Sequence, residues 1–573
     1  MERKPLIRLR LVYLGLLLGG LVLGVRLFFI QIVQGSYYRE RADRQYERPA
    51  DALPDRGSIY FETKDNRLVS AAAMQDGFIL ALNPRQITDA PGLWRALSPL
   101  VALDSDTFFA KANLHNDPYE ELLPRLDEAT ASAINQLDLP GVELIKTRWR
   151  SYPAGSLAAH TVGFMGYDGD TLTGKYGIER EYNEVLERTE DHSFSNFLAE
   201  AFSEVRGSVL GNRAAPTEAD VVLTIEPVVQ QVLETELSDI KKFYSAEAAG
   251  GIVMDPATGK ILVLTAFPTF NPGEKQTDIS VLKNPLVENV YEMGSIIKPL
   301  TMAAAIDAGA VKPTTTYNDA GFRIIDDRRI SNFDGRGRGI VSMQEVLNQS
   351  LNTGVVFAME QMGIQKFRDY FLNFGLGEPT KVDLPNEVSG LVKNLKSGGE
   401  IGAATAAFGQ GLAISPLETI RALASLANGG VLVTPHVVDR LNYPNGTAYE
   451  PAATSSTVRR VLQPGTTEQI TEMLTTVVDK ALVGGAAKLD DYSIAAKTGT
   501  AQIANPAGGY YADRYLHSFF GYFPAKNPKF IIFMYLIRPH GVEYASATLT
   551  QPFMNTAKFL LNYYHIPPDR AAP

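Results

Sequence analysis

Three short motifs in the second half of the chain carry hydroxyl, amine and amide groups in an order that could support nucleophilic catalysis. They are Ser295-Ile-Ile-Lys298, Ser350-Leu-Asn352 and Lys497-Thr498-Gly499. A serine hydroxyl is a weak nucleophile until a base removes its proton, and a lysine can be that base when burial or a nearby cation lowers its pKa. The motifs therefore predict acyl transfer at a serine, provided that the fold brings them together.

The Ser-x-x-Lys spacing is a weak signal by itself, because the chain contains it three times. The copy at Ser238 lies on the polar side of a predicted helix over 227–242, and the copy at Ser280 lies in a polar segment. Neither place is typical of a catalytic serine, since each is explained by a solvated helix face or a loop. Context must therefore choose among the three copies.

Ser295 has the context that the other copies lack. It follows Gly294 and precedes an apolar, alanine-rich run over 300–308, which predicts a buried helix. A spacing of three residues on a helix places Ser295 and Lys298 on one face, so that the amine can reach the hydroxyl. We expect Ser295 to be the nucleophile and Lys298 its base, with Lys497 as the neighbouring cation.

The second motif is predicted to lie in a short connection between helices over 343–347 and 353–362. From such a connection the Ser350 hydroxyl can pass a proton between the lysines and a leaving amine, while the Asn352 amide can hold a substrate backbone. The tripeptide alone carries little information, since serine is common in turns and caps.

The third motif lies within a predicted strand over 493–503. Gly499 would let a ligand backbone approach this strand closely. The hydroxyls of Thr498 and Thr500 beside Lys497 would form an anion site suited to the terminal carboxylate of a peptide. We therefore expect Thr498, Gly499 and Thr500 to bind substrate.

The elements around the motifs predict an antiparallel sheet with helices. A strand over 221–225 precedes the helix over 227–242, in which Val228, Val232, Leu233 and Leu237 share one face. Strands over 250–254 and 261–265 flank the turn 255–259 and predict a hairpin, and strands over 517–523 and 529–537 would continue the sheet. The polar segment from about 187 to 220 is typical of a linker.

The N-terminal segment predicts a membrane anchor. Residues 11–33 are almost wholly apolar, and about 23 residues at about 1.5 Å each can cross a hydrocarbon core of about 30 Å. Four basic residues precede this segment and favour a cytoplasmic N-terminus. A cleaved signal peptide is the alternative, but no small-x-small cleavage site follows. Arg26 could extend to the outer interface or face a polar partner within the membrane.

Composition limits the remaining classes. The chain has 573 residues, of which 45% are hydrophobic, so two globular domains are the first expectation. A net charge of −10 argues against binding to nucleic acid, which requires a basic face. The absence of cysteine excludes disulfides and thiolate metal sites, the seven histidines are scattered, and no P-loop or His-Glu-x-x-His motif occurs. We expect no metal and no cofactor.

The ordered motifs resemble those of the penicillin-binding transpeptidase family. The resemblance extends to the following segments: Phe408-Gly-Gln-Gly411, Ser415-Pro-Leu417, Ala427-Asn-Gly-Gly430 and Ser518-Phe-Phe-Gly521. In the front half, Pro54-x-Arg56-Gly-Ser-Ile59, Arg150-x-Tyr152-Pro-x-Gly155 and Ala159-His-x-x-Gly163 resemble the class B branch. The segment 60–66 and Met293 depart from the usual pattern of the family, and Met293 could alter the helix entry that presents Ser295.

The resemblance implies an α+β multidomain fold. Its expected parts are a cytoplasmic tail over 1–10, a single transmembrane helix over 11–33, an elongated mixed α/β pedestal of the class B dimerisation type over 34–220, and a transpeptidase domain over 221–573. The last domain would have the penicillin-binding and β-lactamase-like architecture of an antiparallel sheet flanked by helices.

The resemblance also implies a reaction. Ser295 would attack the penultimate carbonyl of a D-alanyl-D-alanine stem peptide, and the amine of a neighbouring stem would resolve the acyl-enzyme into a crosslink. The backbone N–H groups of Ser295 and Thr500 would bind the oxyanion. Ser350 and Lys497 would carry protons, Asn352 would orient the donor, and Thr498 and Thr500 would hold the carboxylate of a stem peptide or of a β-lactam antibiotic.

The implied location is the bacterial cytoplasmic (inner) membrane, with the catalytic domain on the periplasmic or extracytoplasmic side. The implied partners are a SEDS-family glycosyltransferase and other membrane proteins of the divisome or elongation complex. The ending Tyr563 to Pro568 and the moderate length favour septal over elongation enzymes. Two other classes stay open: a hydrolase of the D,D-carboxypeptidase or β-lactamase type, and a noncatalytic penicillin-binding sensor or scaffold.

Overall fold

The computed structural model describes residues 55–169, 171–188, 218–451 and 459–570. The predicted cytoplasmic tail over 1–10, the anchor over 11–33 and most of the linker lie outside these ranges. Among the helices that are described, none combines the length and the apolar character that a membrane crossing requires. The described chain forms two compact units, one over 75–149 and one that consists of residues 55–74 and the described residues from 150 to 570.

The unit over 75–149 packs three short helices against strands. The strands are the later part of β2 (Leu68–Leu82), β3 (Glu120–Leu126) and β4 (Val142–Ser151), and the helices are α3 (Ala90–Leu97), α4 (Ser105–Ala112) and α5 (Glu128–Asn135). Each helix begins at an aspartate, Asp89, Asp104 or Asp127, whose carboxylate accepts a hydrogen bond from a backbone N–H of the first turn. The buried core includes Leu80, Leu97, Phe108 and Ile134.

The second unit contains a sheet that combines early and late parts of the chain. In it β1 (Ile59–Glu62) pairs antiparallel with the start of β2 and parallel with β7 (Asp220–Leu223). On its other side β7 pairs with β15 (Val438–Asn442), and β15 pairs with β16 (Ala448–Tyr449). The predicted strand over 221–225 is therefore present as β7, which begins one residue earlier and ends two residues earlier than predicted. The domain boundaries given by the sequence stay predictions.

Two of the front-half segments that resemble the family, those with Arg56 and Arg150, meet at one buried carboxylate. Glu179 of α7 (Gly177–Glu181) is fully buried and accepts from Arg56 Nε at 2.8 Å and from Arg150 Nε at 2.6 Å. Arg56 also donates to the Glu179 carbonyl and Arg150 to the Gly57 carbonyl, each at 2.8 Å. Two guanidinium groups and one carboxylate thus hold together segments that lie far apart in sequence.

The part of the second unit that carries the three motifs is built on a five-stranded antiparallel sheet with the order β18-β19-β20-β8-β9. The strands are β18 (Ala495–Ala504), β19 (Tyr510–Phe523), β20 (Phe530–Ile537), β8 (Ala248–Met254) and β9 (Ile261–Phe267). The predicted hairpin and the three predicted late strands are confirmed, although β19 begins seven residues earlier than expected, at Tyr510. Strand β18 is an edge of this sheet, so one side of its backbone is available to another strand.

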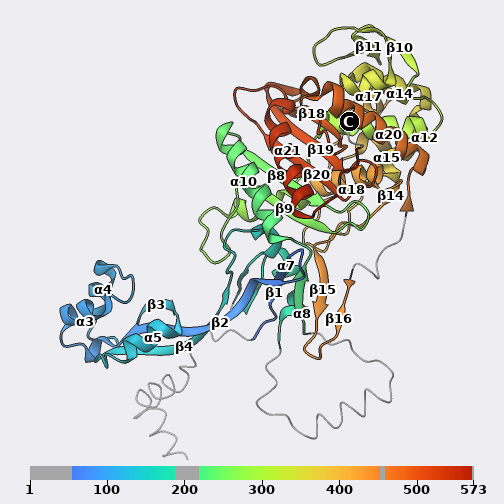
Figure 1. The fold of residues 1–573 in the computed structure, drawn as a ribbon. Helices are drawn as coiled ribbons and strands as arrows, with labels where there is room; N and C mark the ends of the chain where they lie inside the picture. Colours follow the sequence, from blue (N-terminus) through green and yellow to red (C-terminus); the bar gives the residue numbers. More distant parts are fainter. Residues whose placement is uncertain (1–54, 170, 189–217, 452–458, 571–573) are drawn as a thin grey trace, which may run out of the picture. The chain divides into compact units, whose positions relative to one another are not determined.

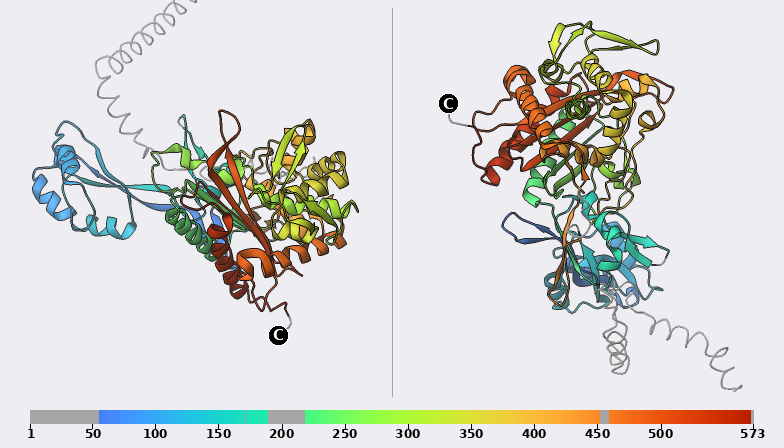
Figure 2. Two further views of the ribbon diagram at one scale, coloured as in Figure 1. Left: turned by 90° about the horizontal axis from the view of Figure 1, so that it is seen from above. Right: turned by 90° about the vertical axis from the view of Figure 1, so that its right-hand side faces the viewer.

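Helices cover both faces of this sheet (Figures 1 and 2). On one face α10 (Pro227–Phe243) and α21 (Ala545–Tyr563) lie side by side over a core that includes Leu233, Leu237, Phe519 and Phe553. The predicted helix over 227–242 is confirmed, but Val228 is 43% exposed. The buried face begins instead at Val229, because Val229, Leu233 and Leu237 are spaced four residues apart and align on one side.

The other face carries the helices that hold the first two motifs. They are α12 (Lys298–Asp307), α13 (Met343–Asn348), α14 (Asn352–Met362), α18 (Pro416–Ala427) and α20 (Pro464–Thr476). Residues 298–305 of α12 are all buried, the polar Lys298 and Thr301 included, so this helix lies wholly within the core. Two small ribbons stand beside these helices, β10 (Thr316–Asp319) with β13 (Gly339–Ser342), and β11 (Phe322–Ile325) with β12 (Arg328–Ser331).

Candidate active site

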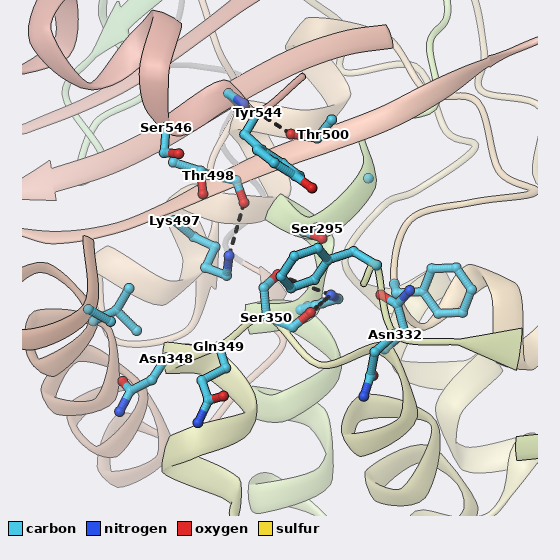
Figure 3. Close-up of a pocket in the computed structure, with 18 of the residues that line it drawn as sticks. Ser295, Asn332, Asn348, Gln349, Ser350, Lys497, Thr498, Thr500, Tyr544 and Ser546 are labelled. Carbon is cyan, nitrogen blue, oxygen red and sulfur yellow. Dashed lines mark hydrogen bonds between the residues drawn. The ribbon is translucent and has the colours of Figure 1, made fainter. Parts of the chain in front are cut away.

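A cleft of about 740 Å³ brings the three motifs together (Figure 3). Its walls come from the start of α12, the connection between α13 and α14, the edge strand β18, and the segment that joins β20 to α21. Of the predicted site residues, Ser295, Lys298, Ser350, Asn352, Lys497, Thr498 and Thr500 line the cleft. Gly499 does not. In Figure 3, Ser295, Ser350 and Lys497 lie around the same space.

Ser295 lies in a 3₁₀ turn rather than in the predicted α-helix. The turn η4 (Gly294–Ile297) leads into α12, and the Ser295 carbonyl accepts from Lys298 N, three residues later. An α-helix would require the N–H of residue 299, but that residue is proline and has none. In a 3₁₀ turn residues three apart are eclipsed, so Ser295 and Lys298 still share one side. The expected pairing on one face survives this correction.

The Lys298 amine is buried and bound to the second motif. Its side chain is 1% exposed, and Nζ donates to the Ser350 carbonyl at 2.5 Å and to Ser350 Oγ at 3.1 Å. Burial, and then the positive charge of Lys497, hold the pKa of Lys298 well below its usual range. A neutral amine has two N–H groups, which these bonds can use, and one lone pair that is left to accept a proton.

Ser350 adopts a backbone conformation that is unusual for serine. It lies between α13 and α14, as predicted, with a φ of +56°. Residues other than glycine rarely occupy this region, and they do so at a cost that clusters at functional sites. The conformation directs both the carbonyl and the hydroxyl of Ser350 to Lys298. Asn352 follows at the start of α14 and donates from Nδ2 to the Ser331 carbonyl at 2.9 Å.

The third motif lies on β18 at the edge of the sheet. Lys497 is 3% exposed, and burial lowers its pKa to about 8. Its Nζ donates to the Thr498 carbonyl at 3.0 Å. Thr500 Oγ1 accepts from Ala545 N at 3.1 Å, which joins this strand to the first residue of α21. A positive charge and two hydroxyls therefore line one side of the cleft.

Close packing requires a glycine at position 499, which the sequence did not predict. A Cβ at this position would lie 2.4 Å from Ser518 Oγ and 2.8 Å from the Met293 carbonyl. Ser518 Oγ donates to that same carbonyl at 2.8 Å. The glycine thus lets β18 approach the segment before Ser295, and Met293, the residue that departs from the family pattern, is fully buried at this contact.

Several further residues line the cleft that the motifs did not indicate. They are Asn332, Phe333, Arg338, Gln349, Gln410 and Tyr544 among others. Gln410 could have been found, since it belongs to the segment Phe408 to Gly411 that resembles the family. Phe333 and Tyr544 contact each other with ring centroids 5.8 Å apart in an edge-on arrangement. No local signal in the sequence singles out either ring.

The alternative serines are placed as the sequence predicted. Ser238 lies on α10, and Ser280 is exposed and bound to Asp278. Neither lines the cleft.

His517 is a buried residue of β19 whose two ring nitrogens are both hydrogen-bonded. Nδ1 is bonded to Thr548 Oγ1 at 2.9 Å and Nε2 to the Glu543 carbonyl at 3.0 Å. Burial lowers the pKa of His517 to about 4.

Comparison with known proteins identifies the family. Residues 249–557 match the penicillin binding protein transpeptidase domain, and residues 51–199 match the penicillin-binding protein dimerisation domain. The chain belongs to the penicillin-binding protein transpeptidase family. The two matches also bear out the expected two-domain arrangement with mixed α/β content.

Curated relatives and solved structures agree with this family. The chain is 28% identical over 541 residues to stage V sporulation protein D of Bacillus subtilis. The aligned region covers 93% of this chain and 82% of that protein. It is 26% identical over 542 residues to peptidoglycan D,D-transpeptidase FtsI of Escherichia coli, covering 92% and 86%. Penicillin binding protein 3 of Mycobacterium tuberculosis, solved with aztreonam, has the same fold, with a TM-score of 0.68 at 24% identity over 91% of this chain and 98% of that one.

Proposed function

We propose that this protein is a class B peptidoglycan D,D-transpeptidase that crosslinks stem peptides through an acyl-enzyme on Ser295. The observation that carries this proposal is the meeting of Ser295 with two buried lysines of lowered pKa in one cleft. The curated relatives named peptidoglycan D,D-transpeptidase support the same reaction.

Acylation begins with the transfer of the Ser295 proton to the lone pair of Lys298 Nζ. Ser295 Oγ then forms a bond to the penultimate D-alanyl carbonyl carbon, and the backbone N–H groups of Ser295 and Thr500 bind the oxyanion. When the C–N bond breaks, the proton passes from Lys298 through Ser350 Oγ to the departing D-alanine amine. The hydrogen bond from Lys298 to Ser350 Oγ provides this route.

Deacylation uses an incoming amine in place of water. The amine of a second stem peptide attacks the ester carbonyl, its proton passes through Ser350 Oγ to Lys298 Nζ, and Lys298 returns a proton to Ser295 Oγ as the C–O bond breaks. The products are a new amide crosslink and the free enzyme, so protons balance over the cycle. A chain that hydrolysed the ester would instead turn over a chromogenic β-lactam rapidly.

Residues of β18 and α14 bind the substrate. An extended donor peptide can lie along the free edge of β18, while Gly499 lets this strand pack closely against the segment that carries Ser295. The charged amine of Lys497 and the hydroxyls of Thr498 and Thr500 hold the terminal carboxylate, while Asn352 orients the donor backbone. A β-lactam presents the same carboxylate and acylates Ser295, which makes these antibiotics inhibitors.

The Ser295→Ala substitution tests the assignment directly. We expect the variant to lose labelling by a fluorescent penicillin completely, because no hydroxyl remains to form the ester. Ser280→Ala is the matched control, since it removes the serine of another Ser-x-x-Lys copy on the surface, and it should label like wild type. A wild-type chain that never labels, or a Ser295→Ala chain that labels normally, contradicts the proposal. Rescue of growth by Ser295→Ala in a depleted strain would indicate a noncatalytic sensor or scaffold.

The pH dependence of acylation should report on Lys497. Its pKa of about 8 means that the amine is charged below that pH and loses its charge as the pH rises through it. If the charge binds the carboxylate, the second-order rate of penicillin acylation should fall by about tenfold per unit above pH 8. In Lys497→Arg the side chain stays charged throughout, so the fall near pH 8 should disappear even if the overall rate is lower. A wild-type rate that stays level from pH 7 to 10 contradicts this role.

The arrangement of the whole chain is also proposed. Residues 1–10 form the cytoplasmic tail, 11–33 the single transmembrane anchor, 34–220 the pedestal and 221–573 the transpeptidase domain, which lies outside the bacterial cytoplasmic membrane. A SEDS-family glycosyltransferase and other divisome proteins are the proposed membrane partners. Depletion tests the cellular role, since filaments indicate division and rounded cells indicate elongation.

A further inference from the structure

One buried carboxylate that the proposed mechanism does not use lies beside the second motif. Asp319, the last residue of β10, is 2% exposed. It accepts hydrogen bonds from four groups: Gly321 N at 3.0 Å, Arg338 N at 3.1 Å, Thr353 Oγ1 at 2.8 Å and Asn332 Nδ2, which lies 3.1 and 2.9 Å from its two oxygens. Burial of a carboxylate is costly unless its oxygens are hydrogen-bonded, and a fully bonded network of this kind makes its surroundings rigid.

The donors around the Asp319 carboxylate are all neutral groups. The guanidinium of Arg338 is directed to Asp334, Gln349 and a backbone carbonyl, and only its backbone N–H reaches Asp319. An ionised carboxylate only accepts hydrogen bonds, which matches four donors around it. Thr353 lies in the first turn of α14, where the helix dipole also favours a negative charge.

The hydroxyl of Thr353 fixes the direction of the network. It has one hydrogen, and the contact with the Asp319 carboxylate is shorter, at 2.8 Å, than that with Asn332 Oδ1, at 3.0 Å. With that hydrogen given to Asp319, the hydroxyl of Tyr317 donates to Thr353 Oγ1 at 3.0 Å. Asn332 Oδ1 meanwhile accepts from Thr353 N at 3.3 Å. The network therefore has one consistent set of donors and acceptors.

The groups that Asp319 holds are next to the proposed donor site. Thr353 directly follows Asn352, and Asn332 directly follows Ser331, whose carbonyl accepts from Asn352 Nδ2 at 2.9 Å. Ser331, Asn332 and Asn352 all line the cleft, and Asn332 appears in Figure 3. Asp319 thus binds Thr353, which follows Asn352 in the chain. It also binds Asn332, which follows Ser331, the hydrogen-bond partner of Asn352.

The nucleophile and its base are held by other contacts. Lys298 binds Ser350, and the backbone N–H groups of Ser350 and Leu351 bind carbonyls of α13. None of these bonds involves Asp319. A change at Asp319 should therefore act on the orientation of Asn352 and of the cleft wall, and much less on the proton transfer from Ser295.

We propose that Asp319 is a positioning residue that sets the orientation of Asn352 and of the wall at Asn332, and so determines how tightly the donor is bound. This inference rests on the proposed function, in which Asn352 contacts the donor. Its effect falls on binding before the chemical step, which separates it from a residue that only stabilises the fold.

Asp319→Asn tests this inference, because it keeps the shape of the side chain and replaces an acceptor oxygen by an N–H group. In stopped-flow acylation of the full-length chain by a fluorescent penicillin, we expect the dissociation constant of the noncovalent complex to rise about tenfold, while the rate constant of acylation within the complex changes by less than about threefold. Asp327→Asn is the matched control. It makes the same charge change at an exposed position of the neighbouring ribbon, and it should leave both constants unchanged.

Thr353 provides a second test if Asp319→Asn fails to fold. Thr353→Val removes the hydroxyl at nearly constant shape and should weaken binding in the same way, whereas Thr353→Ser keeps the hydroxyl and should restore it. In the double variant Asp319→Asn with Thr353→Val, the combined effect should be close to that of the larger single change, because both break one network. The inference is overturned if Asp319→Asn lowers only the melting temperature, if Thr353→Val binds penicillin normally, or if the two effects multiply. A wild-type chain that does not label contradicts the proposed function itself.

Discussion

Lys298→Met is expected to lower the rate of acylation by a fluorescent penicillin by at least about 10³-fold while the chain stays folded. The reason is that the proposal assigns the role of base to Lys298 Nζ, which donates to Ser350 Oγ and keeps a lone pair for the proton of Ser295. Methionine fills nearly the same volume in the buried site, so that the loss measures the missing base rather than a cavity. Lys298→Ala should lose acylation to the same extent.

The measurement needs a lysine control and a folding control. Lys283→Ala removes the exposed lysine of the Ser280 copy of the motif and should acylate like wild type. Thermal unfolding of Lys298→Met should stay within a few degrees of wild type, since a buried amine is exchanged for an apolar group. If the folded variant acylated within tenfold of the wild-type rate, another group would have to be the base.

Glu179→Gln is expected to lower the free energy of unfolding of its unit by about 3–5 kcal/mol, because it leaves two buried guanidinium groups without their carboxylate. Arg56 and Arg150 are 3% and 4% exposed, so water cannot replace the lost partner without opening the fold. One nitrogen of Arg150 already has no hydrogen-bond partner within the described residues, so this cluster has few other acceptors that could replace the lost carboxylate.

Urea unfolding followed by circular dichroism measures this loss. Glu181→Gln is the matched control, since Glu181 lies on the same short helix and is exposed, and it should change stability by less than about 0.5 kcal/mol. Below the transition, Glu179→Gln should still acylate, because Glu179 does not line the cleft. A loss of less than about 1 kcal/mol would show that the two arginines find other partners.

The sequence predicted those parts of the fold that depend on local pattern. The strands over 517–523 and 529–537 are rich in aromatic and aliphatic residues, and the hairpin around 255–259 is marked by turn residues, so each could be found without tertiary information. The choice of Ser295 over Ser238 and Ser280 also rested on neighbouring residues, and the structure places only Ser295 in the cleft.

The features that were missed depend on contacts between distant segments. Asp319, Asn332 and Thr353 form one network across 35 positions, and none of them stands out locally. The pairing of Glu179 with Arg56 was missed for the same reason, although Arg56 itself lies in a segment that resembles the family. The 3₁₀ turn at Ser295 is different, because Pro299 was visible in the sequence and removes the one N–H that an α-helix would need.

The order β18-β19-β20-β8-β9 has a consequence for biosynthesis. The two strands that are synthesised first, β8 and β9, form one side of the sheet, and β8 can complete its pairing only after β20 has been synthesised. Strand β18 is connected to β8 and β9 only through β19 and β20. Pairing over such a separation is slow, since a long loop must close before the contacts form. A partly synthesised chain therefore contains the Ser295 segment but has no β18 against which to assemble a working centre, so the enzyme is inert towards cell-wall precursors until nearly its last residues have been made.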